Sequence, residues 1–196
     1  MRQVLTLFAA ALLSIAGFAT APLQAAEEIE NPPGQWRHEA SGVVWPKMLG
    51  EADRGSITAF DDLRLDVSTG YVLRSSQGVL IMTFYVYPSP SGWSCEETFA
   101  DARSLVARYD GAQLLWEGAA PSPDGTNSAG ARRVRYHIPA GSMREGYPEL
   151  VSDLYLYCPS GSDWLVKYRA SWTGTAAEFP DVPALLTQIA WPEDLR

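Results

Sequence analysis

The chain has 196 residues, with a hydrophobic content of 46% and a charged content of 19%. This composition supports a sizeable hydrophobic core and excludes an intrinsically disordered protein. The formal net charge of −8 argues against general binding to nucleic acids or anionic membranes, because both are polyanions.

The N-terminal residues have the three-part pattern of a secretory signal peptide. Arg2 supplies a positive charge, residues 4–18 are apolar and uncharged, and residues 19–26 are mostly small. A membrane-spanning helix is the alternative, but the apolar run is short and no basic flank follows it. We therefore predict a signal peptide over residues 1–25 that is cleaved after Ala25, and an exported protein that resides in the periplasm. No stable membrane insertion is expected after cleavage.

The first half of the mature chain is predicted to form strands. Residues 26–35 are acidic and contain prolines, so we expect a flexible lead-in. Strands are expected at residues 36–45, 56–63 and 65–75. The short turn at residues 76–78 favours a hairpin with the next strand. That strand, residues 81–87, is a continuous apolar run, which is typical of a strand covered on both faces.

A helix with a defined start follows this strand. Ser94 precedes Glu97 by three residues, which is the spacing of a capping box. Asp110-Gly111 is typical of a helix end. Between them, apolar residues recur at helical spacing and predict one buried stripe: Phe99, Ala102, Leu105, Val106 and Tyr109.

The second half alternates strands with polar loops. Strands are expected at residues 112–116, 131–138, 150–158 and 164–172. Residues 118–130 and 139–148 have loop composition, and Asp181 is placed to cap a short closing helix that Trp191-Pro192 ends. Because hairpin connections dominate, we predict a single α+β domain over residues 26–196, with helices packed on an antiparallel sheet.

The sequence contains two cysteines, Cys95 at the start of the predicted helix and Cys158 at the end of a predicted strand. An even pair in an exported chain predicts a disulfide. A reactive thiol at the helix start is the alternative, since a helix N-terminus lowers the pKa of a thiol. The pairing requires no further residues, so the disulfide is the preferred interpretation.

Four segments carry a resemblance to a known fold family: DVSTGY at residues 66–71, TFYVYP at 83–88 with its helix, LYLYCPSGSDWLVKYRASW at 154–172, and the closing AWP at 190–192. Together they resemble the fold family of PsbP, the extrinsic photosystem II subunit, and its exported proteobacterial relatives. The resemblance implies an α/β/α sandwich, in which helices flank an antiparallel sheet. It also implies a non-enzymatic adaptor, chaperone or assembly factor. The metal-ligand clusters of the plant proteins do not map onto this chain, so the resemblance transfers no site.

Catalytic motifs do not emerge from the sequence. The chain has two histidines, His38 and His137, and no G-x-S-x-G motif or phosphate-binding loop. Asp61, Asp62 and Asp66 cluster between strands, but without the spacing of a calcium loop, so we interpret them as a solvated turn. We therefore predict no catalytic residue, no metal site and no cofactor.

Positive charge is concentrated on two predicted strands. By strand alternation, Arg133, Arg135 and His137 share one face of one strand, and Lys167 and Arg169 share one face of another. If the strands are neighbours, these residues form a basic strip that binds an anionic ligand or an acidic partner segment. Four tyrosines are expected nearby: Tyr85, Tyr87, Tyr155 and Tyr157. A solvated or charge-paired sheet face is the alternative.

These observations predict a non-enzymatic binding, chaperone-like or assembly module of the cell envelope. Its partner is expected to be another envelope protein or a small anionic ligand. Two alternatives stay open. One is a periplasmic immunity-type protein that inhibits a secreted toxin, because the acidic charge suits a basic toxin. The other is a hydrolase whose active-site residues carry no recognisable motif.

Overall fold

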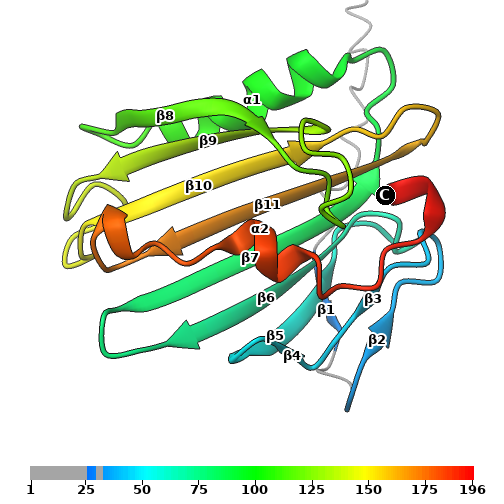
Figure 1. Ribbon diagram of the computed structural model, residues 1–196, viewed down its shortest axis with the longest axis horizontal. Helices are drawn as coiled ribbons and strands as arrows, with labels where there is room; N and C mark the ends of the chain where they lie inside the picture. Colours follow the sequence, from blue (N-terminus) through cyan, green and yellow to red (C-terminus); the bar gives the residue numbers. More distant parts are fainter. Residues whose placement is uncertain (1–25, 30–32) are drawn as a thin grey trace, which may run out of the picture.

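The computed structural model describes residues 26–29 and 33–196, so the predicted signal peptide lies outside the described residues. Within them, nine antiparallel strands form one sheet (Figure 1). The order across the sheet is β1 (Glu27–Ile29), β5 (Ala52–Ala59), β6 (Val67–Arg74), β7 (Val79–Pro88), β11 (Trp164–Trp172), β10 (Leu150–Tyr157), β9 (Ala131–Ile138) and β8 (Gln113–Ala120). The short strand β4 (Met48–Leu49) also pairs with β5.

The remaining elements are short. Strands β2 (Trp36–Arg37) and β3 (Val44–Trp45) form a separate two-stranded sheet. Helix α1 spans Cys95–Ala107 and helix α2 spans Val182–Leu186. Two 3-10 turns complete the described chain, η1 (Ala176–Glu178) and η2 (Glu193–Leu195).

The centre of the sheet is the pairing of β7 with β11, which are far apart in sequence. Their register runs from Pro88 opposite Trp164 to Leu80 opposite Trp172. This pairing joins a hairpin from the first half of the chain, β6–β7, to the β10–β11 hairpin of the second half. The two predicted hairpins are therefore confirmed, and the long-range pairing places β7 in the middle of the sheet.

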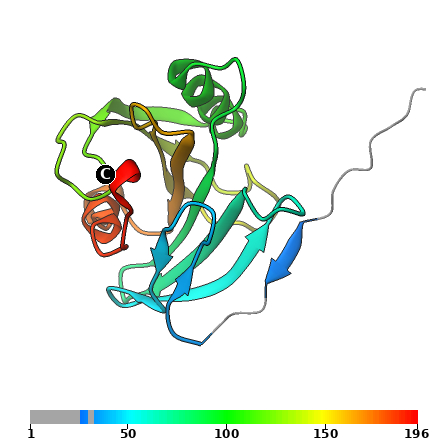
Figure 2. The same ribbon diagram turned by 90° about the vertical axis from the view of Figure 1, so that its right-hand side faces the viewer.

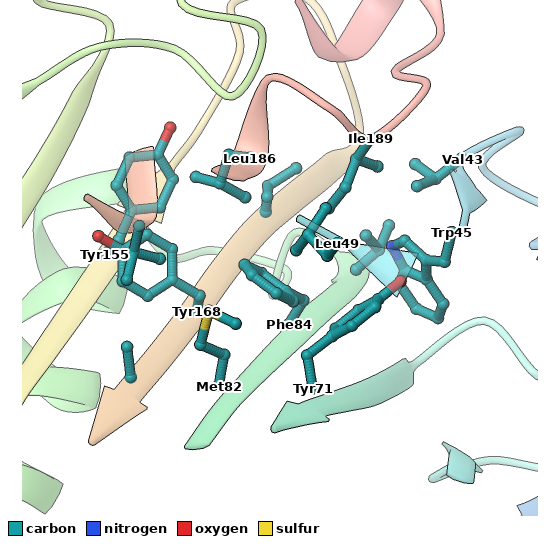
Figure 3. Close-up of a cluster of buried hydrophobic side chains, with 14 of the residues drawn as sticks. Val43, Trp45, Leu49, Tyr71, Met82, Phe84, Tyr155, Tyr168, Leu186 and Ile189 are labelled. Carbon is teal, nitrogen blue, oxygen red and sulfur yellow. The ribbon is translucent and has the colours of Figure 1, made fainter. Parts of the chain in front are cut away.

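The two faces of the sheet bury different clusters of apolar side chains. On one side, which we call the α2 face, Phe84 and Tyr168 pack beneath Leu186 and Ile189 (Figure 3). Trp45, from the small β2–β3 sheet, extends this cluster. On the opposite side, the α1 face, the apolar stripe of α1 packs over the β9–β11 end of the sheet. Figure 2 shows α1 and α2 on opposite sides of the strands.

Helix α1 forms as its sequence predicts. The Ser94 hydroxyl accepts a hydrogen bond from the Glu97 amide at 3.2 Å, and the Glu97 carboxylate accepts one from the Ser94 amide at 2.8 Å. Phe99, Ala102 and Val106 are buried in the stripe. The predicted disulfide is also confirmed, because Cys95 and Cys158 are joined with their Cα atoms 6.0 Å apart.

The predicted α/β/α sandwich is wrong. Among the described residues, 41% lie in strands and 14% in helices, so the protein is a mainly antiparallel β structure. Helix α1 covers only part of its face, and α2 is five residues long. The opposite face is covered largely by short strands, turns and irregular chain, which carry Val43, Leu49 of β4, Ile189, Trp191 and Leu195 of η2. Apolar side chains from these short segments cover the sheet, so this face is buried without a layer of helices. The apolar spacing near the C-terminus did not distinguish a helix from a turn beyond Leu186.

Three smaller expectations also change. Glu27–Ile29 of the expected flexible lead-in pairs with β5. The predicted 118–130 loop begins later, because β8 continues to Ala120. Strand β7 is buried on one face only, since Ile81 is half-exposed while Leu80 and Met82 are fully buried. Among the described residues, no helix has the length and apolar character needed to cross a membrane.

Candidate functional site

The predicted basic strip is divided between the two faces of the sheet. Strand β10 lies between β9 and β11, so the two basic strands are not neighbours. Arg133 lies opposite Tyr155 of the α2-face cluster, and Arg169 lies opposite Leu154 of the α1-face cluster. By strand alternation Arg135 and His137 accompany Arg133, and Lys167 accompanies Arg169. The expectation of one continuous strip is therefore wrong.

On the α2 face, Arg133 and Arg135 hold a buried carboxylate that the sequence analysis did not identify. Asp153 is 0% exposed. Its Oδ2 accepts from Nε of Arg133 at 2.7 Å, and its Oδ1 accepts from Nε of Arg135 at 2.6 Å. The Arg135 guanidinium also lies 4.0 Å from the centre of the Phe179 ring. A buried carboxylate needs such partners, so these two arginines have a structural role.

His137 lies apart from this ion cluster. Its Nε2 is 3.5 Å from a carboxylate oxygen of Glu149, whose side chain is largely exposed. An exposed pair of this kind contributes little to stability or binding. The sequence could have pointed to the buried carboxylate of Asp153, because Asp153 is the single charged residue within the mostly apolar run 150–158.

On the α1 face, three adjoining cavities form a groove along β7 and β11, which we call the β7 groove. Their volumes are about 340, 110 and 460 Å³, and all three are lined by Tyr85. Lys167 lines the first two cavities, and Arg169 lines the last two. The groove exists because α1 covers the β9–β10 side and leaves the outward residues of β7 open.

Lys167 lies between aromatic rings in the groove. Its Nζ is 4.3 Å from the centre of the Tyr85 ring and 5.1 Å from that of Tyr87. These are cation–π distances. Burial lowers the pKa of Lys167, and burial raises the pKa of Tyr85 and of Tyr87, so both tyrosines stay neutral at physiological pH.

Arg169 is the second cation of the groove. Its Nη1 donates to the Tyr109 hydroxyl at 3.3 Å, and its Nε donates to the Ser152 hydroxyl at 3.4 Å. Its Nη2 is buried and has no hydrogen-bond partner among the described residues. Arg169 lines two of the three cavities, so its guanidinium group places positive charge beside the groove.

Apolar side chains form the rim of the groove. Trp93 is 51% exposed and Ile81 is 52% exposed, at opposite ends. Phe60 stacks on Tyr85 with ring centres 6.4 Å apart. Asp66 also lines the groove, and burial raises the pKa of its carboxyl group. The groove thus combines apolar contact area with cations in its floor.

His38 lies outside the Asp153 cluster and the β7 groove, and its side chain is buried. The Ser41 hydroxyl donates to Nδ1 of His38 at 2.7 Å, and Nε2 of His38 donates to the Arg64 carbonyl at 2.7 Å. Both side chains are buried, and burial lowers the pKa of His38. The pair stabilises the turn in which the Gly42 amide donates to the His38 carbonyl.

Among the described residues, no group of three or more His, Cys, Asp or Glu side chains is placed to hold a metal ion.

Comparisons with protein-family models, with curated proteins and with solved structures found no match. The resemblance to the PsbP fold family therefore stays a prediction.

Proposed function

We propose that this protein is an exported, non-enzymatic binding module of the cell envelope, and that the β7 groove binds an extended acidic segment of a partner protein. The Cys95–Cys158 disulfide supports export, because disulfides persist in oxidising compartments.

The observation that carries the proposal is the pair of cations in the floor of the groove. Among the described residues, no carboxylate lies within ion-pair distance of Lys167 or Arg169. Arg133 and Arg135 of β9 already bind Asp153. Asp66 and Asp101 line the cavity at the Lys167 end, whereas the cavity at the Arg169 end has no carboxylate in its described lining. An acidic occupant is therefore favoured at the Arg169 end of the groove, although the net charge of −8 alone suggested a basic partner.

The length of the groove favours an extended segment over a single small anion. Ile81 and Tyr87 line its two end cavities, and a strand rises about 3.3 Å per residue, so the floor spans about 20 Å. The apolar rim offers contacts for leucine-like side chains, and the two cations offer contacts for carboxylates. An alternating acidic and apolar peptide matches both features.

Fluorescence anisotropy with defined peptides tests this proposal. The probe is a fluorescein-labelled octapeptide of alternating Glu and Leu, and the matched probe carries Gln in place of Glu. We expect the Gln peptide to bind at least about tenfold more weakly, because one charge-assisted hydrogen bond contributes about 1.5–3 kcal/mol and 1.4 kcal/mol is tenfold. Lys167→Met and Arg169→Met are each expected to weaken binding of the Glu peptide by about tenfold or more.

Arg108→Met is the control, since Arg108 is an exposed arginine at the end of α1 that does not line the groove. It removes the same charge and should leave binding within about twofold. Equal binding of both peptides, or equal loss in all three variants, contradicts the proposal. Binding of inorganic phosphate without binding of the Glu peptide would show a small-anion site instead and overturn the peptide assignment.

A further inference from the structure

The two ends of the β7 groove carry different charges. The cavity at the Lys167 end, with a volume of about 340 Å³, is also lined by Asp66 and Asp101. The cavity at the Arg169 end, with a volume of about 460 Å³, has no carboxylate in its described lining. Two carboxylates and one ammonium leave negative charge in excess at the first end, whereas the guanidinium makes the second end positive. The groove is therefore polar along its length.

Asp66 and Asp101 reach the first cavity from two different elements. Asp66 directly precedes β6 and is half-buried, and Asp101 is an exposed residue of α1. Burial lowers the pKa of Lys167, and the charges of Asp66 and Asp101 act against that shift. Both carboxylates therefore lie close enough to interact with the ammonium group. Among the described residues, however, no cation lies within ion-pair distance of either carboxylate.

Aromatic rings complete the lining of the first cavity. Tyr85 and Tyr87 line it and already contact Lys167. Phe60 and Trp93 line it as well, and in the described part of the chain neither ring has a cation above it. Aromatic faces and carboxylates both attract positive charge, and the rings also pack against an alkyl chain. The first cavity thus suits a lysine side chain better than a glutamate.

We propose that the segment bound in the β7 groove carries a lysine that enters the cavity lined by Asp66 and Asp101 and, four residues away, an acidic side chain at Arg169. This inference rests on the proposed function of the groove and adds the order of the charges to it. The spacing follows from β7, because Tyr87 lines the first cavity and Thr83 pairs with Arg169, about 13 Å further along the strand. In an extended segment, residues four apart point to the same side, so both charged side chains can face the groove together.

Fluorescence anisotropy with charge-patterned octapeptides tests this inference. The reference probe begins with glutamine and continues with alternating leucine and glutamate, and the lysine probe has lysine in the first position. Both are acetylated at the N-terminus and labelled with fluorescein at the C-terminus, so the lysine is the only ammonium group. We expect the lysine probe to bind about tenfold more tightly, because a hydrogen bond between an ammonium and a carboxylate contributes at least that much.

A third probe and three protein variants locate the lysine contact. Exchanging the first two residues of the lysine probe moves the lysine to the other side of the segment without changing the composition, so the gain should fall below about twofold. The double variant Asp66→Asn, Asp101→Asn should also reduce the ratio of the lysine probe to the reference probe below about twofold, because both carboxylates are lost.

Asp62→Asn is the matched control, since Asp62 is an exposed carboxylate that does not line the groove. It removes one negative charge and should leave the ratio within about twofold of wild type. Retained binding of the reference probe shows that the double variant is folded. If that binding is lost, Asp101→Asn alone, at an exposed position, should reduce the ratio to about threefold, which is half of the tenfold gain in free energy.

Three outcomes contradict the inference. Equal binding of the lysine and reference probes overturns it and leaves the proposed acidic contact at Arg169 intact. A ratio that falls as far in Asp62→Asn as in the double variant also overturns it, because the attraction then comes from the net charge of −8 and not from the cavity. If the wild-type protein binds none of the probes, the proposed function and this inference fail together.

Discussion

Asp153 and Lys167 lie on adjacent strands of one sheet, but only Asp153 has oppositely charged side chains within ion-pair distance among the described residues. Asp153 is fully buried and binds two guanidinium groups, which satisfy both of its oxygens. Lys167 is held by the rings of Tyr85 and Tyr87, and burial lowers its pKa. The first arrangement stabilises the fold, and the second leaves a cation in contact with an open groove.

Replacing Asp153 is expected to destabilise the protein strongly. Asp153→Asn leaves Arg133 and Arg135 partly buried and without their carboxylate, which we expect to lower the free energy of unfolding by about 3 kcal/mol. Urea denaturation measures this change. Glu149→Gln, which removes the exposed partner of His137, should change the free energy by less than about 0.5 kcal/mol. A loss below about 1 kcal/mol for Asp153→Asn would contradict the structural role.

The titration of Lys167 is expected to appear in both binding and stability. Because its folded-state pKa is lowered from 10.5, the unfolded chain holds the proton more tightly. Relative to Lys167→Met, wild-type stability should therefore rise as the pH increases from the folded-state pKa towards 10.5. Affinity for the Glu peptide should fall over the same interval, because the ammonium loses its charge. A binding curve that stays flat up to pH 10.5 would exclude Lys167 from the contact.

At the scale of single elements, α1 has the most complete set of local signals. Its capping box is encoded within residues 94–97 and forms as predicted. The apolar stripe forms in part, since Phe99, Ala102 and Val106 are buried but Leu105 is 44% exposed. The Cys95–Cys158 bond then ties its first turn to the end of β10. The wall of the β7 groove that α1 supplies is therefore fastened at its N-terminal end.

Removing that bond is expected to destabilise the fold. The two cysteines are separated by 63 residues in sequence, and the loop-entropy model for a loop of that length gives about 4 kcal/mol. The double variant Cys95→Ser, Cys158→Ser should lose an amount of this order in urea denaturation. Ser94→Ala, which removes the capping side chain alone, should lose about 1 kcal/mol. A double variant as stable as wild type would show that the bond does not stabilise the native state.

At the scale of the whole molecule, the two faces of the sheet differ in how they are covered. The β7 groove opens on the α1 face between β7 and α1. The α2 face is closed by α2 and by short strands and turns from both ends of the described chain (Figure 3). The proposed binding groove therefore lies on the face that is less completely covered.

The sequence by itself determined the features that depend on nearby residues. Strand alternation, turn residues and a capping box act over a few positions, so the β6–β7 and β10–β11 hairpins and helix α1 were predictable. The disulfide was predictable because only two cysteines are present. The short closing helix was also predictable, because Asp181 caps α2 as expected, but the helix ends at Leu186 and a turn carries the chain on to Trp191.

Only the tertiary structure decided which surface each basic residue occupies. Alternation places Arg133 with Arg135, and Lys167 with Arg169, but the register of β9 and of β11 against β10 sets the two pairs on opposite faces. The same order brings Asp153 to Arg133 and Arg135, and it leaves Lys167 and Arg169 in the groove. Strand order and register depend on the burial of both sheet faces at once, and no local pattern in the sequence contains that information.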